Sequence, residues 1–137
     1  MKAMSKTTLG FIYSAFFYLV VGVVLGVLFT FIPELRKLSA VHGHANLIGF
    51  ISFMVFGIAY HILPRFRGRP LYSETLGWVQ LWMANIGLAG FLIFLALEKY
   101  MEIPPFLPGL FASLLGLSIL LFVYNMSRTL LGPYKEK

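Results

Sequence analysis

The chain has 137 residues, of which 59% are hydrophobic and 12% are charged, which excludes a disordered protein and an ordinary soluble domain. The basic residues behind its net charge of +6 are spread in ones and twos between apolar blocks, an arrangement that argues against nucleic-acid binding. The absence of cysteine excludes disulfides, thiolate metal sites, thiol nucleophiles and cysteine-attached heme.

Four blocks free of Asp, Glu, Lys and Arg predict a small membrane protein with four spanning helices. The blocks cover residues 9–32, 38–63, 75–97 and 103–127. Each exceeds the roughly 20 residues that a helix needs to cross the hydrocarbon core, where backbone groups must be paired within the segment. The first block is too long for a signal peptide and has no small-residue cleavage site, so we expect it to be retained as a span.

The connections between these blocks are short and polar. Pro33 ends the first helix, residues 64–70 separate the second from the third, and residues 98–102 precede the fourth. Short connections make sequence neighbours antiparallel. We therefore predict an all-α fold, an integral membrane four-helix up-down bundle that forms one transmembrane domain over residues 1–137.

The distribution of basic residues predicts how the bundle is oriented. The two termini and the second connection share one side of the membrane, and the first and third connections share the other. The first side carries eight Lys and Arg residues, the second carries three: Arg36, Lys37 and Lys99. The positive-inside rule then predicts cytoplasmic termini and a location in the inner (cytoplasmic) membrane.

All three histidines lie in the second block, where an ionisable residue is costly and marks a candidate functional site. At about 100° per residue, His42 and His44 point some 200° apart and are expected to serve different sites. His61 lies about 25 Å further along the helix and cannot join them, so we expect a snorkelling or loop-bonded role. Spacing alone leaves two roles open for His42 and His44: ligands, or interfacial histidines bonded to water or backbone.

The two outer histidines have different neighbours on the helix surface. Beside His44 runs an aliphatic wall formed by Leu47, Ile48, Ile51, Val55 and Ile58. Beside His42 runs a face of glycines and aromatic residues, formed by Asn46, Gly49, Phe53, Phe56, Gly57 and Tyr60. Glycines on a membrane helix admit either a partner helix or a flat ligand at close range, and both remain open for this face.

The order of motifs in this region resembles a known family. Residues 42–50 read HGHANLIGF, residues 59–73 read AYHILPRFRGRPLYS, and residues 78–87 add a W-x-x-x-W pair and an I-G dipeptide. Together these motifs resemble the tenth and eleventh transmembrane helices of the catalytic subunit of heme–copper oxidases, most of all its cbb-type branch. The resemblance covers about a third of the chain, from position 41 to 87.

The resemblance implies a role for each histidine of the pair. In that family the first histidine ligates the high-spin heme of the oxygen- or NO-reducing centre, and the second ligates the low-spin heme that delivers electrons. By position, His42 resembles the high-spin ligand and His44 the low-spin ligand. The family's helix also begins at the outer face of the membrane, as the charge distribution predicts here.

Departures from the family limit what the resemblance implies. The chain lacks the second histidine of the low-spin heme, the three copper-ligating histidines and the paired arginines of a later loop. Gln80 stands where the family has a histidine. These differences argue against copper and against oxygen reduction by this chain alone.

A heme b in this protein needs an apolar slot, an axial donor and partners for its propionates. On the His42 side, Asn46, Gly49 and Tyr60 are expected to line the pocket. Arg36 and Lys37 lie at the level of the histidines and could pair with propionates, or be ordinary interfacial charges. The sixth iron position has three candidates: a histidine from a second copy of the chain in a homodimer or homotrimer, the thioether of Met101, or a diatomic gas.

Three functions follow from these expectations. The first is a b-type heme protein of the inner membrane that transfers electrons or binds O2 or NO, with a respiratory-chain protein as a possible partner. The second is a cofactor-free accessory or assembly subunit of a terminal oxidase or NO reductase. The third is a transporter of small solutes or metals, although no inverted repeat is visible.

Overall fold

The computed structural model describes residues 4–132, and this part of the chain contains helices and no strand. Four helical stretches are long and apolar enough to cross a membrane: Lys6–Phe31, Pro33–Phe66, Glu74–Leu97 and Phe106–Leu131. The prediction of an all-helical chain with four such stretches is confirmed. Three basic residues of the orientation count, Lys2, Lys135 and Lys137, lie outside the described residues.

The first helix, α1 (Lys6–Phe31), begins earlier than its apolar block. The Ser5 hydroxyl accepts a hydrogen bond from the Thr8 amide at 3.2 Å and so caps the first turn. Thr7 and Thr8 are buried against the rest of the protein, which lets a polar first turn lie inside the helix bundle. The apolar block begins at residue 9 and the helix at Lys6, three residues earlier, because the cap rather than hydropathy sets the helix start.

The second span is not one regular α-helix. It is built in order from η1 (Pro33–Leu38, a 3₁₀ helix), α2 (Ser39–His44), η2 (Ala45–Ser52, a π-helix) and α3 (Phe53–Phe66). In η2 the Ser52 hydroxyl donates to the Leu47 carbonyl, five residues earlier, at 3.0 Å. The wider π turns rotate every residue after His44 away from the 100° periodicity expected for this span, and such turns are common at functional sites.

The last two helices form a tightly packed hairpin. Ser73 caps α4 (Glu74–Leu97) by accepting from the Leu76 amide at 3.1 Å. α5 (Phe106–Leu131) begins after Pro104 and Pro105, later than the predicted position 103, because the prolines occupy the preceding turn. At Gly87 the α4 backbone approaches α5 so closely that an added methyl group would lie 2.7 Å from the Leu115 amide nitrogen.

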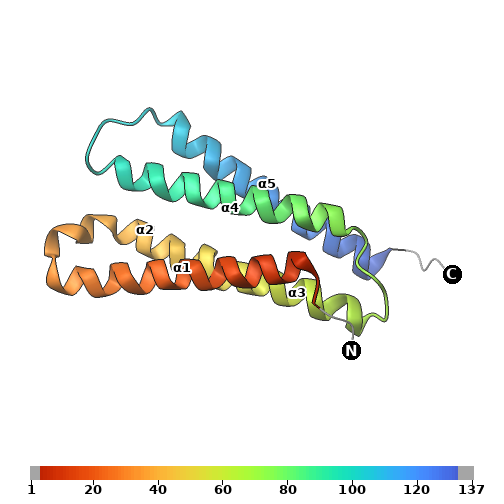
Figure 1. Cartoon of the computed structure of the whole chain (residues 1–137). Helices are drawn as coiled ribbons and strands as arrows, with labels where there is room; N and C mark the ends of the chain where they lie inside the picture. Colours follow the sequence, from red (N-terminus) through yellow and green to blue (C-terminus); the bar gives the residue numbers. More distant parts are fainter. Residues whose placement is uncertain (1–3, 133–137) are drawn as a thin grey trace.

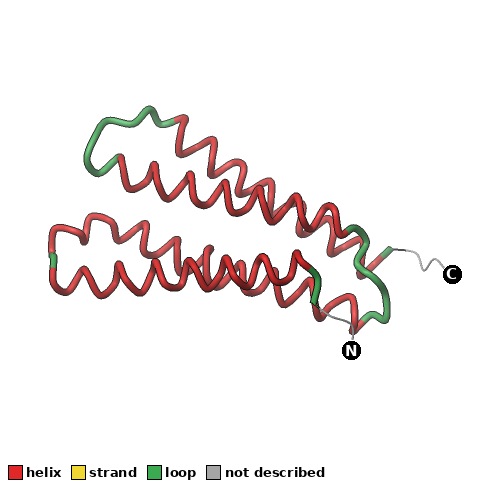
Figure 2. Tube along the Cα trace, in the orientation of Figure 1, coloured by secondary structure: helices red, strands yellow, loops and turns green. Residues whose placement is uncertain are grey.

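Two helical hairpins, α1 with the second span and α4 with α5, make up the molecule (Figure 1). Figure 2 shows connections at both ends of the molecule, and the first residues of α1 and the last residues of α5 at one end, which we call the proximal end. Near it, an aromatic cluster joins the hairpins, since the Phe122 ring of α5 lies 4.6 Å from Phe56 and 5.4 Å from Tyr60.

The opposite end, called the distal end below, carries His42 and His44. The ribbons of the two hairpins lie further apart there (Figure 1). Two contacts between the hairpins are found at this end: the Lys37 ammonium lies 3.6 Å from the centre of the Tyr100 ring, and the His44 ring packs against Phe91. The fold therefore brings α4 and the loop after it opposite the histidines.

Candidate functional site

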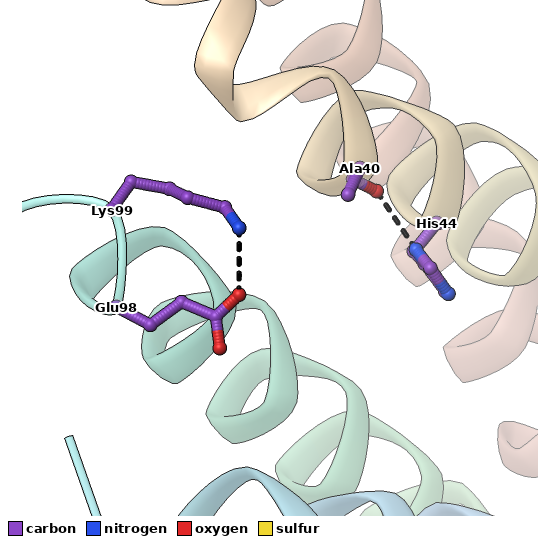
Figure 3. Close-up of polar contacts among 4 residues, drawn as sticks. All are labelled: Ala40, His44, Glu98 and Lys99. Carbon is purple, nitrogen blue, oxygen red and sulfur yellow. Dashed lines mark hydrogen bonds and ion pairs between the residues drawn. The ribbon is translucent and has the colours of Figure 1, made fainter.

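His44 is the last residue of α2, and its ring is oriented by its own helix. The Nδ1 atom lies 2.8 Å from the Ala40 carbonyl oxygen, one turn earlier. Because a carbonyl only accepts, Nδ1 carries the proton of the neutral ring, and Nε2 is left with a lone pair. Figure 3 shows the ring on the side of α2 that faces α4, with its second nitrogen directed away from Ala40.

The surroundings of the His44 ring are apolar. It packs edge-on against the Phe91 ring of α4, with centroids 5.2 Å apart and an interplanar angle of 76°. Further along the span, Leu47, Ile51, Val55 and Ile58 are all exposed, which leaves most of the predicted aliphatic wall without cover from the rest of the chain. Ile48 is the exception and packs against the core.

His42 points to a different helix. Its Nδ1 lies 2.8 Å from the Gly22 carbonyl oxygen of α1, and its ring centroid is 5.6 Å from that of Phe29. Gly26 adjoins the same ring, because a methyl group at that position would lie 3.0 Å from its Cε1. The two histidines thus contact α1 and α4 respectively, as their 200° separation predicts.

Helix α1 covers the glycine and aromatic face beside His42. Asn46 donates through Nδ2 to the His42 carbonyl at 2.9 Å, and its side chain lies against Gly22. The Tyr18 side chain covers Gly49. Of the two occupants expected for this face, a partner helix or a flat ligand, the helix is the one found, and a porphyrin at His42 requires α1 to move.

Tyr60, which was expected to line a pocket with Asn46 and Gly49, lies in a different part of the molecule. It is on α3 near the proximal end, about 25 Å from His42 at roughly 1.5 Å per residue. Its ring stacks on Phe11 at 6.1 Å and meets Phe122 at 5.4 Å. The structure does not bring Tyr60 to His42.

The charged candidates lie at the distal end and have contacts within the chain. Arg36 donates through Nε to the Phe29 carbonyl at 3.3 Å, and Lys37 lies over the Tyr100 ring. Both side chains are exposed, as is that of Met101, in the loop after α4.

Phe91 and Lys99 belong to the site but were not identified from the sequence as site residues. Lys99 forms an ion pair with Glu98, with 2.9 Å between Nζ and Oε1, and Figure 3 shows this pair across from His44. Phe91 lies in an unbroken apolar run, where nothing marks one position as the neighbour of a histidine. Only the packing of α4 against α2 identifies it.

His61 lies half-buried on α3, away from the histidine pair. In residues 4–132, no three His, Asp or Glu side chains come together in a way that could hold a metal ion. A heme makes a smaller demand on the protein, because the porphyrin supplies four nitrogen donors and the chain only one or two. His44 could supply one such nitrogen, because its Nδ1 is bonded to the Ala40 carbonyl, its Nε2 is left with a lone pair, and its ring packs against Phe91.

Comparisons of this chain with protein-family models, curated proteins and solved structures gave no match.

Proposed function

We propose that the protein is a heme-binding integral membrane protein and that His44 is an axial ligand of a b-type heme. One observation supports this most directly: His44 donates from Nδ1 to the Ala40 carbonyl, which leaves the lone pair of Nε2 available to a metal. Metal-ligating histidines nearly always donate their other ring nitrogen to a carbonyl or carboxylate, which sets the tautomer and the ring orientation.

The sequence motifs around His42 and His44 support the same proposal, through their resemblance to the catalytic subunit of heme–copper oxidases. Nδ1 of His42, like that of His44, is directed at a backbone carbonyl, here that of Gly22, whereas Nε2 of His42 lies 3.4 Å from Nδ2 of Asn46. We propose His44 as the primary ligand, because α1 covers His42, whereas the ring of His44 packs against Phe91 of α4. His42 is the second candidate, for a site that forms when α1 shifts.

We further propose that the four spans form an up-down bundle in the inner membrane, with both termini in the cytoplasm. The distal end then faces the periplasm and carries Arg36, Lys37 and Lys99, which are long enough to reach heme propionates at the membrane boundary. The basic residues on the opposite side support this orientation. Bound heme would supply the redox and gas-binding chemistry, while the chain excludes water and orients the imidazole.

The ligand at the sixth iron position decides between electron transfer and gas binding. We propose a homodimer or homotrimer in which a second copy brings its own histidine to the interface, because the wall beside His44 is exposed in the single chain. Bis-histidine iron suits electron transfer to or from a respiratory-chain partner. Met101 in this position would do the same, whereas an open position suits O2 or NO binding. The missing histidines argue against copper.

Absorption spectroscopy of the purified protein tests the proposal. Protein expressed with a heme precursor is expected to be red, with a Soret band that shifts and sharpens on reduction by dithionite. Carbon monoxide then separates the two coordination states, since five-coordinate ferrous heme shifts its Soret band and bis-histidine heme does not. Colourless, folded protein would overturn the proposal.

The alternative function is a cofactor-free accessory or assembly subunit of a terminal oxidase or NO reductase. The close packing of α1 on the His42 face favours it. Gly22 of α1 and Gly49 of that face let the two helices approach closely, so helix packing alone explains the face. Protein that stays colourless under the conditions above, but copurifies with an oxidase or reductase, would support this alternative.

A further inference from the structure

A buried polar group near the proximal end has no hydrogen-bond partner within residues 4–132. Gln80 of α4 is completely buried, and neither its carboxamide oxygen nor its nitrogen is hydrogen-bonded. The hydroxyl of Tyr60 on α3 is also buried, and its polar neighbour is the side chain of Asn125. A buried carboxamide without partners is strongly disfavoured in a low-dielectric interior, so the carboxamide of Gln80 needs a hydrogen-bond partner.

The nearby polar side chains are already engaged elsewhere. Asn125 of α5, a neighbour of Tyr60, accepts from the Ser73 amide at 3.1 Å and donates to the Ser73 carbonyl at 2.8 Å. Thr129 donates to the Asn125 carbonyl, and Ser118 donates to the Leu115 carbonyl. The chain therefore pairs its other buried polar groups in this region and leaves Gln80 without a partner.

A hollow lies at the proximal surface, beside the first turns of α1 and α4. It is lined by Ser5, Lys6, Thr7, Glu74, Thr75 and Trp78. Gly77 adjoins both Thr7, which lines the hollow, and Tyr60, since a methyl group on Gly77 would lie 3.1 Å from Thr7 Cγ2 and 3.5 Å from Tyr60 Cε1. Gln80 follows one turn later on the same face of α4.

We propose that Gln80 and the Tyr60 hydroxyl bind internal water that is continuous with this hollow. The ligand is water itself, which can donate to the carboxamide oxygen, accept from its nitrogen and bridge to the phenol. Gln80 is six residues into α4, so solvent reaches about 9 Å along the helix at 1.5 Å per residue. Beyond it Ala84, Leu88 and Leu92 are buried and apolar, and close the path.

The result is a water-filled path that begins at the proximal end and stops at Gln80, before it reaches the level of the histidines. We call it the half-path. It does not depend on the heme proposal, because none of its residues contacts His42 or His44. A glutamine in this position supplies both a donor and an acceptor for water without adding a charge to the interior of the bundle.

Nuclear magnetic resonance on the unmodified protein tests this inference, because Gln80 is the only glutamine in the chain. Selective side-chain ¹⁵N labelling of glutamine in nanodiscs therefore gives a single carboxamide signal. We expect that signal to show magnetisation exchange with water, at a rate at least tenfold above that of the backbone amide of Leu88. A carboxamide that exchanges no faster than Leu88 would overturn the inference.

Cysteine accessibility provides a second measurement, since the native chain has no cysteine. Gln80→Cys is expected to react with silver ions, which need a water path, at least tenfold faster than Ala84→Cys. Ala84 is the matched control, because it is completely buried one turn further along the same face and lies beyond the proposed water. Equal rates for the two variants, both verified as folded, would contradict a half-path that ends at Gln80.

Discussion

At the scale of single residues, the ring of each outer histidine is oriented by a hydrogen bond to a backbone carbonyl. Each ring places Nδ1 at 2.8 Å from a backbone carbonyl, which favours the tautomer with a lone pair on Nε2, and Nε2 of His42 lies 3.4 Å from Nδ2 of Asn46. They differ in what surrounds them. Gly22, Gly26 and Phe29 of α1 enclose His42, whereas Phe91 of α4 meets His44.

Substitution of each histidine separates their roles. We expect His44→Ala to lose the low-spin heme spectrum, with heme per protein falling at least tenfold. We expect His42→Ala to leave that species in place and to alter a different species or gas binding. Reduced-minus-oxidised spectra at equal protein concentration measure both effects. Equal, full-strength spectra in the two variants would show that neither residue is a ligand.

His61→Ala is the matched control for these variants. It removes the third histidine of the same span, at a depth where the resemblance places no iron ligand and away from the pair. Its heme content is expected to equal that of the native protein. Loss of pigment in His61→Ala would show that the assignment of the iron site to the distal end is wrong.

At the scale of helices, small residues set which elements pair. In lipid the surrounding tails are as apolar as the side chains, so helices associate where backbones can approach closely. Gly22 and Gly49 bring α1 against the second span, and Gly87 and Gly90 bring α4 against α5. Gly49, which Tyr18 of α1 covers, lies within the π-helix that follows His44.

The contact at Gly87 gives a stability prediction with a built-in control. Gly87→Ala places a methyl group against the Leu115 backbone, which cannot move without separating α4 from α5, and is expected to destabilise the protein by about 1–3 kcal/mol. Gly116→Ala, on α5 with no atom within 4 Å of the new methyl group, is expected to be neutral or to stabilise by about 0.5–1 kcal/mol. Thermal unfolding in one detergent measures both, and equal midpoints would contradict the packing.

At the scale of the whole molecule, the two hairpins are joined firmly near the proximal end and more sparingly at the distal end. Phe122 inserts among the aromatic side chains of the first hairpin, and Arg67 donates to the Leu130 carbonyl at 3.1 Å. At the distal end, the contacts of Lys37 with Tyr100 and of His44 with Phe91 join the hairpins. The candidate heme site thus lies where the hairpins are held less tightly.

The proposed oligomer can be tested through its mass and through its interface at the exposed aliphatic wall of the second span. Native mass spectrometry of heme-loaded protein in mild detergent is expected to give two or three copies of the 15.5 kDa chain. Ile51→Gln, in the wall beside His44, is expected to lower the oligomeric fraction, because a lone amide is costly in an apolar interface. Val24→Gln on α1 is the control, since both native side chains are 50% exposed. A monomeric native protein that carries heme would contradict the proposal.

The sequence by itself determined the four spans and the different directions of His42 and His44. It could do so because lipid imposes length and hydropathy on each helix locally, and because a single α-helical turn fixes the angle between neighbours. It did not give the start of α1 at Lys6, where the Ser5 cap rather than hydropathy decides, or the π-helix at 45–52.

Only the tertiary structure decided which helix covers which histidine and which polar side chain is left unpaired. Every span is apolar on most of its surface, so hydropathy does not distinguish a face that meets lipid from one that meets another helix. That choice depends on close packing between segments far apart in sequence, such as Tyr18 on Gly49 and Phe91 on His44. For the same reason the burial of Gln80 could not be read from its place in an apolar block.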